Sequence, residues 1–411
     1  MTRITKHLGL LALGLSLAAA AHAQVGPEVL TQRIVVFKES TSPAQRVSIA
    51  TASGAKVTRE LGLINAVVIA VPSGQIQTAE GRLRVKTEVL RIDEDPKINW
   101  LSTPATLHDI VLPDVKSIIR PFKAVGRALP AQDPSTDAQV TPWGITRVNA
   151  PAAWAVTRGD GVKLVVIDTG IDYDHPELKP LIAGGWNATN KDKPADFKDD
   201  NGHGTHCSGS IAAVDNEAGV VGVAPKVALY GVKVLDANGS GTFSDVIAGM
   251  QWAVDNKMQI ASMSLGASRG NDSLKAAVEA MVKGGVVLIA AAGNSGGAVG
   301  FPAAYPGAIA IAASDKNDKV ASFSSRGPEV ALLAPGVDVN STYMGGGYSS
   351  LSGTSMATPH VAGLAALAIA AKGLSGDSAV RAALKAAATP LAGVPPAQQG
   401  AGIVDAAKLV K

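Results

Sequence analysis

Cysteine is almost absent from this sequence, with Cys207 as its one example among 411 residues. A single cysteine cannot form an internal disulfide, so the stability of the fold must come from elsewhere. Aromatic residues are also scarce, at 4% of the chain, whereas Gly and Ala are abundant. We therefore expect an α/β core of small side chains, and the length indicates two or three folding units.

The sequence has no large excess of charge of either sign. Its 37 Lys and Arg residues nearly balance 34 Asp and Glu residues, which leaves a formal net charge of +3. Because the basic residues are scattered, we expect no nucleic-acid partner. Beyond the N-terminus, no segment is both apolar and long enough to span a membrane, so we expect no membrane partner.

The N-terminal segment has the features of a secretory signal peptide. Arg3 and Lys6 give a basic start, residues 8–20 are apolar, and Ala21-His22-Ala23 is a small-residue cleavage signal. The alternative, a membrane anchor, needs about 20 apolar residues. We predict that residues 1–23 are removed and that the protein is secreted.

Residues 33–100 have the pattern of a small α+β unit. Residues 101–137 contain five prolines and little periodicity, which predicts a linker. The strands of the unit are expected at 33–38, 65–72 and 89–96, and its helices at 42–54 and 74–84.

From residue 138 to the end, continuous apolar runs alternate with helical patterns. This alternation predicts a mostly parallel central sheet with helices on both faces. The strands are expected at 162–168, 227–235, 259–265, 286–294 and 308–314, and the helices at 245–256, 272–285 and 359–373.

Polar residues lie at the ends of these predicted strands and helices, where sites in parallel sheets collect. Asp168 ends a strand in VVIDTGID, Asn294 ends another in AAAGNSG, and Ser355 begins an apolar helix in GTSMATPHVAG. At a helix start, Ser355 has free backbone N–H groups nearby.

The stretch NGHGTHCSG (201–209) adds His203 and His206 beside Cys207. Taken alone, these residues leave two interpretations open, a zinc ligand set or an imidazole that acts as a base. Asp, His and Ser together supply what acyl transfer requires, namely a carboxylate, a base and a nucleophile.

Three motifs, VVIDTGID, GHGTHCSG and GTSMATPHVAG, resemble the active-site motifs of the subtilisin-like serine proteases, the subtilase family. The order Asp, His, Ser is also that of subtilisin. The similarity covers about residues 138–411 and implies a subtilisin-like fold. It implies that Asp168 orients His203, that His203 is the general base and then acid, and that Ser355 is the nucleophile. The Asn294 amide and the Ser355 N–H would form the oxyanion hole.

The resemblance also bears on the histidines and the cysteine. It implies that His206 is structural and points toward the following helix and its neighbours, and no HExxH motif or acidic cluster supports zinc. The H-G-T-H-C run is shared with proteinase K, and its i, i+4 spacing places Cys207 beneath the His203 ring. We expect a buried, non-catalytic thiol that only a small soft metal such as Hg²⁺ can reach.

Two segments resemble the family's substrate-binding strands. NGSGTFS (238–244) would pair with an extended peptide, and SLGA (264–267) would form the opposite pocket wall, closed by residues 291–293. Small residues and the uncharged Ser295 favour large apolar P1 side chains, although broad, sequence-tolerant proteolysis remains an alternative. The implied substrate-binding residues are Gly239, Ser240, Gly241, Ser264, Leu265, Gly266, Ala267 and Gly300, with Ala267 narrowing one rim.

The segment AVDNEAGVVGVAP (213–225) resembles the family's calcium loop, and oxygen ligands of this kind suit structural Ca²⁺. An ordinary surface loop is the alternative. The family more often has Asp where Glu177 stands. The implied ligands are Gln139, Glu177, Val214, Asn216, Ala218 and Val220.

Residues 33–100 resemble the family's propeptide. We therefore expect a signal peptide at 1–23, a propeptide at 24–137 and a catalytic domain at 138–411. The propeptide would act as an intramolecular inhibitor and chaperone, with self-cleavage near Trp100 or Leu101 and trimming toward Ala138. The expected partners are protein and peptide substrates, and the expected state is a monomer.

Two other functions were weighed. An aspartic protease also carries D-T-G, but it needs a second copy of that motif, and this sequence has only the one at 168–170. A non-catalytic peptide-binding relative usually lacks a member of the triad, whereas this chain has all three and Asn294 as well.

Overall fold

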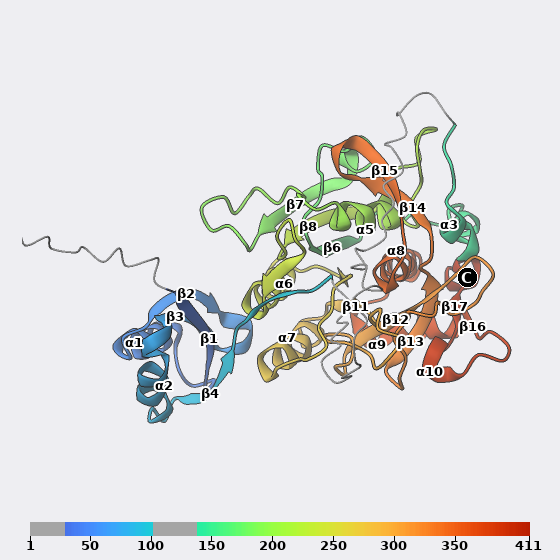
Figure 1. Ribbon diagram of the computed structural model, residues 1–411. Helices are drawn as coiled ribbons and strands as arrows, with labels where there is room; N and C mark the ends of the chain where they lie inside the picture. Colours follow the sequence, from blue (N-terminus) through green and yellow to red (C-terminus); the bar gives the residue numbers. More distant parts are fainter. Residues whose placement is uncertain (1–28, 102–137) are drawn as a thin grey trace, which may run out of the picture.

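The computed structural model describes residues 29–101 and 138–411 (Figure 1). The expected signal peptide and, apart from Leu101, the expected linker lie outside these residues. A small antiparallel sheet with helices precedes a large, mostly parallel sheet with helices, so the predicted fold class is confirmed.

The small sheet has the strand order β2-β3-β1-β4 with antiparallel pairing throughout. Its expected strands and helices are present, and the sequence analysis missed only β2 and short turns. The elements are β1 (Leu30–Phe37), α1 (Pro43–Ala52), β2 (Lys56–Leu61), the 3-10 turn η1 (Gly62–Ile64), β3 (Ala66–Pro72), the 3-10 turn η2 (Ser73–Gln75), α2 (Ile76–Arg84) and β4 (Val89–Glu94).

Alternation along β1 and β3 gives the small sheet two apolar faces, because successive side chains of a strand point to opposite sides. Val35 and Val67 belong to a local core with α1 and α2. Ile34 and Val68 belong instead to the core cluster that continues into the large unit. The second face is therefore covered by the large unit, where β2 and η1 lie against α6 and α7.

The large sheet has nine strands, all parallel to their neighbours except for the terminal β16–β17 pair. The sequence predicted five adjacent strands, β12, β11, β10, β6 and β8, and missed β13 and the strands at the two edges. In spatial order the strands are β16 (Ala388–Thr389), β17 (Ile403–Val404), β13 (Val330–Pro335), β12 (Ala308–Ser314), β11 (Val287–Ala291), β10 (Ile260–Met263), β6 (Lys163–Asp168), β8 (Ala228–Lys233) and β7 (Ile182–Asn187).

Two pairs of long helices pack on this sheet (Figure 1). α5 and α8 contact each other, and α8 lies along β10 to β13; α6 and α7 form the second pair. The hairpin β14–β15 lies against α5. The bounds are α3 (Trp143–Arg147), α4 (Ala150–Ala153), α5 (His203–Ala212), α6 (Phe243–Asp255), α7 (Asp272–Lys283), α8 (Thr354–Lys372), α9 (Gly376–Ala386), α10 (Pro396–Gln399), α11 (Ala406–Leu409), β14 (Val339–Tyr343), the 3-10 turn η4 (Met344–Gly346) and β15 (Gly347–Leu351), with η3 at Lys179–Leu181.

Among the described residues, α8 alone is long and apolar enough to cross a membrane by length and composition. However, 89% of the apolar window is buried inside the fold. α8 is therefore the central core helix, and its N-terminus brings Ser355 to the edge of the sheet.

Candidate active site

Asp168 is the last residue of β6, at the carboxyl edge of the sheet, and it is fully buried. Its Oδ1 lies 2.8 Å from His203 Nδ1 and also accepts a hydrogen bond of 2.7 Å from the Thr169 backbone N–H. This geometry requires the proton on Nδ1, which leaves Nε2 of a neutral imidazole as the free base. Among the described residues, the groups of this kind that gather with Asp168 are His203 and Cys207, and this cluster contains no second carboxylate of an aspartic protease dyad.

His203 begins α5, and the loop before it is fixed by Asp199. Both Asp199 carboxylate oxygens accept hydrogen bonds, Oδ1 from the Asn201 and Gly202 N–H groups and Oδ2 from Thr205. Gly202 has φ of 102°, and a side chain there would also meet the Tyr343 ring. The position of His203 therefore depends on a glycine and on a carboxylate that the sequence analysis did not single out.

The pKa of His203 reflects two opposing effects. Burial alone lowers it, since only 13% of the side chain is exposed. The negative charge of Asp168 and the hydrogen bond to it outweigh burial, so the pKa lies well above the ordinary 6.5. The buried carboxylate therefore makes His203 a stronger base than a free histidine.

Ser355 is the second residue of α8 and follows Gly353 and Thr354. Its backbone N–H belongs to the first helical turn, where such groups have no partner within the helix. Its Oγ donates to the Ser264 carbonyl at 3.0 Å, and its own carbonyl accepts from Ser264 Oγ at 2.8 Å. The structure records no hydrogen bond between Ser355 and His203, both of which it describes.

Asn294 follows β11, and its amide orientation is determined by Thr354. Asn294 Oδ1 accepts hydrogen bonds from the Thr354 backbone N–H at 2.8 Å and from Thr354 Oγ1 at 2.9 Å. Both groups are donors toward this oxygen, so the amide Nδ2 is the end left to donate into the cleft. The sequence analysis missed Thr354, because its role is visible only through this contact.

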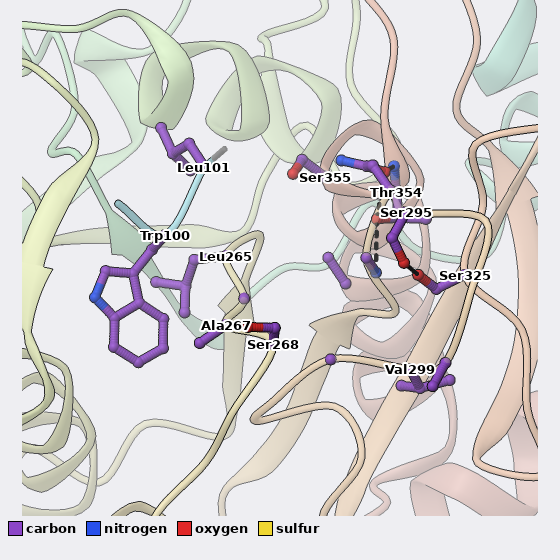
Figure 2. A pocket seen from close by; sticks show the side chains of 16 residues that line it. Trp100, Leu101, Leu265, Ala267, Ser268, Ser295, Val299, Ser325, Thr354 and Ser355 are labelled. Atoms are coloured by element: carbon purple, nitrogen blue, oxygen red, sulfur yellow. Dashed lines mark hydrogen bonds between the residues drawn. The ribbon is translucent and has the colours of Figure 1, made fainter. Parts of the chain in front are cut away.

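A cavity of about 270 Å³ lies beside Ser355 and Asn294 (Figure 2). Leu265, Gly266, Ala267 and Gly300 line it, as expected, and Ala267 pairs through its backbone with Phe301. Ser325 was not expected; it lies in the lining and hydrogen-bonds Ser295 at 3.1 Å. The walls thus carry small or neutral side chains and no charge.

The predicted edge strand is β9 (Ser240–Thr242), and it pairs with a segment of the chain itself. The antiparallel partner is β5 (Lys97–Asn99), at the end of the small unit. Trp100 continues this pairing, because its N–H donates to Gly239 O and its carbonyl accepts from Gly266 N. Trp100 and Leu101 both line the cavity. Residues 97–101 therefore occupy the groove between β9 and Gly266, where the sequence analysis expected a peptide.

Trp100 anchors this segment, with only 2% of its surface exposed. Its indole Nε1 donates to the Gly241 carbonyl at 3.0 Å, and its ring lies edge-on to Phe243 with centroids 4.9 Å apart. Leu101 lies against Gly239, where any side chain would collide with it. Gly239 thus leaves room for the Leu101 side chain, whereas a side chain at Gly241 would collide with the Val234 carbonyl.

Four of the predicted calcium ligands converge in the structure. Gln139 Nε2 lies 2.8 Å from Val214 O, 3.5 Å from Asn216 Oδ1 and 3.4 Å from Val220 O. Backbone bridges join Ala138 to Ala218 and Val140 to Val220. The oxygens that gather around one point are therefore Val214 O, Asn216 Oδ1 and Val220 O, with the Gln139 amide N–H donating among them. With that amide turned to present Oε1, the set would suit a hard cation such as calcium.

Glu177 is the third predicted side-chain ligand, after Gln139 and Asn216, and is almost fully buried. Its oxygens accept hydrogen bonds from Tyr348 Oη and the Val220 N–H, and burial raises its pKa to about 7. Neutral donors alone do not offset the cost of burying a carboxylate charge. Glu177 therefore also fits a role beside a cation, although its side chain is one methylene longer than the Asp that the family more often has there.

His206 is buried and bonds to the backbone of the β14–β15 hairpin. Its Nε2 lies 3.0 Å from Val339 O and 3.1 Å from Ser349 O, and this hairpin lies against α5. Burial lowers its pKa to about 3, which keeps it neutral. Among the described residues, the potential metal ligands that gather are Asp168, His203 and Cys207, without His206. The set of His203, His206 and Cys207, which the zinc interpretation would require, is therefore not brought together.

Cys207 lies where the helical spacing predicted. Its Sγ is 4.0 Å from His203 Nδ1 and 3.5 Å from the Ser355 carbonyl, and it is fully buried. Burial raises the pKa of the thiol. A neutral, enclosed thiol lacks the thiolate character and the access that reactivity needs.

Comparison with family models matches residues 159–402 to the model described as Subtilase family. The chain is 50% identical over 234 residues to the thermostable alkaline protease of Halalkalibacterium halodurans, covering 56% of this chain and 63% of the relative. It is 48% identical over 273 residues to alkaline elastase YaB of Bacillus sp. strain YaB, with 66% and 70% covered. It is 45% identical over 258 residues to subtilisin E of Bacillus subtilis, with 61% and 67% covered. The first of these matches thus spans less than two thirds of the relative.

Proposed function

Since this chain belongs to the subtilase family, we propose that it is a secreted serine endopeptidase that hydrolyses peptide bonds through an acyl-enzyme. The observation that carries the proposal is the meeting of Asp168, His203 and Ser355 beside a groove filled by an extended peptide segment. The relatives named as proteases or elastase support the same activity.

In the proposed mechanism, Ser355 Oγ attacks the scissile carbonyl while His203 Nε2 takes its proton. Asp168 keeps the other proton on Nδ1 and stabilises the imidazolium that forms. The developing oxyanion is held by the Asn294 amide and the Ser355 N–H, whose positions are fixed by Thr354 and by the first turn of α8. His203 then gives its proton to the leaving amine, and water releases the acyl group by the reverse sequence.

Substrates would bind as an extended strand between β9 and residues 264–266. Residues 97–101 support this mode, since they already make backbone hydrogen bonds to Gly239 and Gly266. Such bonds do not depend on side chains, which allows broad specificity. The uncharged primary pocket favours large apolar P1 residues, with Ala267 and Phe301 at one rim.

The unit at 29–101 is proposed to be an inhibitory propeptide that the enzyme itself removes. Beyond the groove contacts, Arg59 pairs with Asp245 at 2.9 Å, and Asp95 accepts a hydrogen bond from the Ser244 N–H at the start of α6. Asp93 accepts from Ser273 Oγ at the start of α7. Carboxylates at two helix N-termini favour formation of these helices, which suits a chaperone role. The corresponding division is a signal peptide at 1–23, a propeptide at 24–137 and a catalytic domain at 138–411.

The loop at 213–225 is proposed to hold one structural calcium ion, with Gln139, Glu177 and Asn216 as side-chain ligands and the Val214, Ala218 and Val220 carbonyls completing the set. When bound, the ion supplies no catalytic chemistry; it ties the first residues of the catalytic domain to the loop. We further propose that the mature enzyme acts as a monomer on protein and peptide substrates.

The test is hydrolysis of an unfolded protein by the purified mature enzyme, with and without a serine-directed phosphonyl or sulfonyl fluoride. We expect activity that the fluoride abolishes and a covalent adduct that maps to Ser355. Activity that survives the fluoride but is lost with an aspartic-protease inhibitor would contradict the proposal, as would peptide binding without any hydrolysis.

A further inference from the structure

Lys233 is a buried lysine at the end of β8, with only 4% of its surface exposed. Its ammonium donates three hydrogen bonds, to Thr169 O at 2.7 Å, Leu235 O at 2.7 Å and Asp200 Oδ1 at 2.6 Å. An ammonium has three N–H donors, so every one of them has a partner.

The three acceptors belong to three different parts of the active site. Thr169 directly follows Asp168, and Asp200 lies in the loop that leads into His203. Leu235 begins the segment that continues to β9, where peptide binds in the proposed mechanism. One ammonium therefore links the residue after Asp168, the loop before His203 and the segment that leads to the groove.

The backbone strengthens the same junction. Lys233 is the direct neighbour of Asp168 in the parallel β6–β8 pairing. The Asp168 carbonyl accepts from the N–H groups of Val234 and Leu235, and Thr169 Oγ1 accepts from Gly204 N–H. A displacement of Thr169 would therefore move Asp168 and the start of α5 together.

Burying an ammonium is unfavourable unless its hydrogen bonds are satisfied, and apolar residues of similar size can stabilise a fold equally well. The lysine at this position is better explained by the position of its three acceptors than by stability alone. From this geometry we propose that Lys233 is a positioning residue for the hydrolytic reaction, which holds Asp168 and His203 in register with the peptide groove. The inference rests on the proposed function of the triad.

Three variants test this role in the processed enzyme: Lys233→Met, Asp200→Asn and, as the matched control, Lys163→Met. Lys163 is an exposed lysine at the start of the neighbouring strand β6. The half-exposed Asp200 gives a milder change, which keeps the test valid if Lys233→Met folds poorly. Active sites are counted by titration with a fluorophosphonate, and kcat, KM and the acid limb of kcat/KM are measured per titrated site.

We expect Lys233→Met to lose about 10- to 100-fold in kcat/KM, because small misplacements of catalytic groups cost that much. The acid midpoint should move to lower pH in Asp200→Asn, because a looser Asp168–His203 contact and the loss of a nearby negative charge both lower the His203 pKa. Asp200→Asn should lose less in kcat/KM than Lys233→Met, and Lys163→Met should change neither quantity.

Unchanged kcat/KM and an unchanged acid midpoint per titrated site in both Lys233→Met and Asp200→Asn would overturn the inference, even if melting temperatures fell. Ser355→Ala distinguishes this failure from failure of the proposed function. An active Ser355→Ala enzyme would contradict the triad itself, whereas an inactive one beside fully active Lys233 variants would contradict only the positioning role.

Discussion

At the scale of single residues, the surroundings of His203 determine the pH range in which Ser355 can be activated. The reaction requires neutral His203, and Asp168 raises the His203 pKa well above 6.5. Protonation therefore begins at a higher pH than for a free histidine. We expect kcat/KM to fall by about tenfold per pH unit below a midpoint above 6.5, which a pH series with a small ester would measure. A profile that stays flat down to about pH 4 would contradict a histidine base.

Cys207 allows a second test at this scale. Its Sγ lies beneath the imidazole, enclosed by α5 and the Ser355 carbonyl. Hg²⁺ bound to this sulfur would displace His203, so we expect mercury to inhibit the enzyme, bulky alkylating agents to act slowly and reductants to have no effect. Cys207→Ser should remain active and become insensitive to mercury. An inactive variant would make the thiol catalytic, and an equally sensitive one would place the mercury elsewhere.

The candidate catalytic residues could be found from the sequence, whereas the residues that position them could not. Asp168, His203 and Ser355 lie in long motifs whose spacing resembles a known family. Thr354 lies inside one of these motifs and Lys233 lies outside all three, and a threonine at a helix start and a lysine in a strand both have many ordinary roles. Their importance depends on distances to residues far away in the sequence, which only the fold defines.

At the scale of elements, the strand-like segment at 138–140 and the loop at 213–225 are held together mainly by backbone bridges and the Gln139 amide. A calcium ion bound only to the folded state would stabilise by about 2.7 kcal/mol at a hundredfold excess over Kd. For a domain of this size we expect chelation to lower Tm by about 5–10 °C. The initial rate at moderate temperature should change less.

The control is Asn216→Ala, which should abolish most of the calcium-dependent part of Tm. Equal melting of the unaltered enzyme in calcium and in excess chelator would show that the loop holds no ion. An equal calcium effect in Asn216→Ala would place the ion at another site.

Burial on both faces accounts for most of the strands that the sequence predicted, although β13 is equally buried and was missed. β6, β11 and β12 are continuous apolar runs buried on both faces, and the sequence shows them plainly. β7 (Ile182–Asn187) contains Gly184 and Gly185 and is only partly buried, so it lacks such a pattern. Gly185 is needed because Phe197 and the Gly231 carbonyl leave no room for a side chain. β2 is similarly obscured by charged residues, among them Arg59, which pairs with the large unit.

At the scale of the whole molecule, the small unit and the large unit form one continuous core, and the end of the small unit lies in the groove. If the enzyme cuts its own chain near Trp100 or Leu101, Ser355→Ala should accumulate as an uncut protein after signal removal. Mass spectrometry of the secreted protein would measure this. The active enzyme should instead yield a new C-terminus near Leu101 and, after trimming, an N-terminus near Ala138.

Secretion of a normally cut Ser355→Ala protein would assign the cleavage to another protease. Cys207→Ser provides the matched control, because it alters the neighbourhood of Ser355 without removing the hydroxyl and should be processed normally.

Leu101 lies beside the nucleophile while Ala138 already pairs with Ala218, in one uncut chain. Cleavage of the chain between Leu101 and Ala138 therefore need not change any contact described around either residue. Its effect is that the small unit and the large unit become two separate molecules. Before the cut, a small unit that leaves the groove stays attached and returns at a rate independent of protein concentration. After the cut its return is bimolecular. Dilution on secretion would then activate the enzyme. Of two samples of the same cleaved protein, the more dilute one would have the higher activity per molecule until the small unit is degraded.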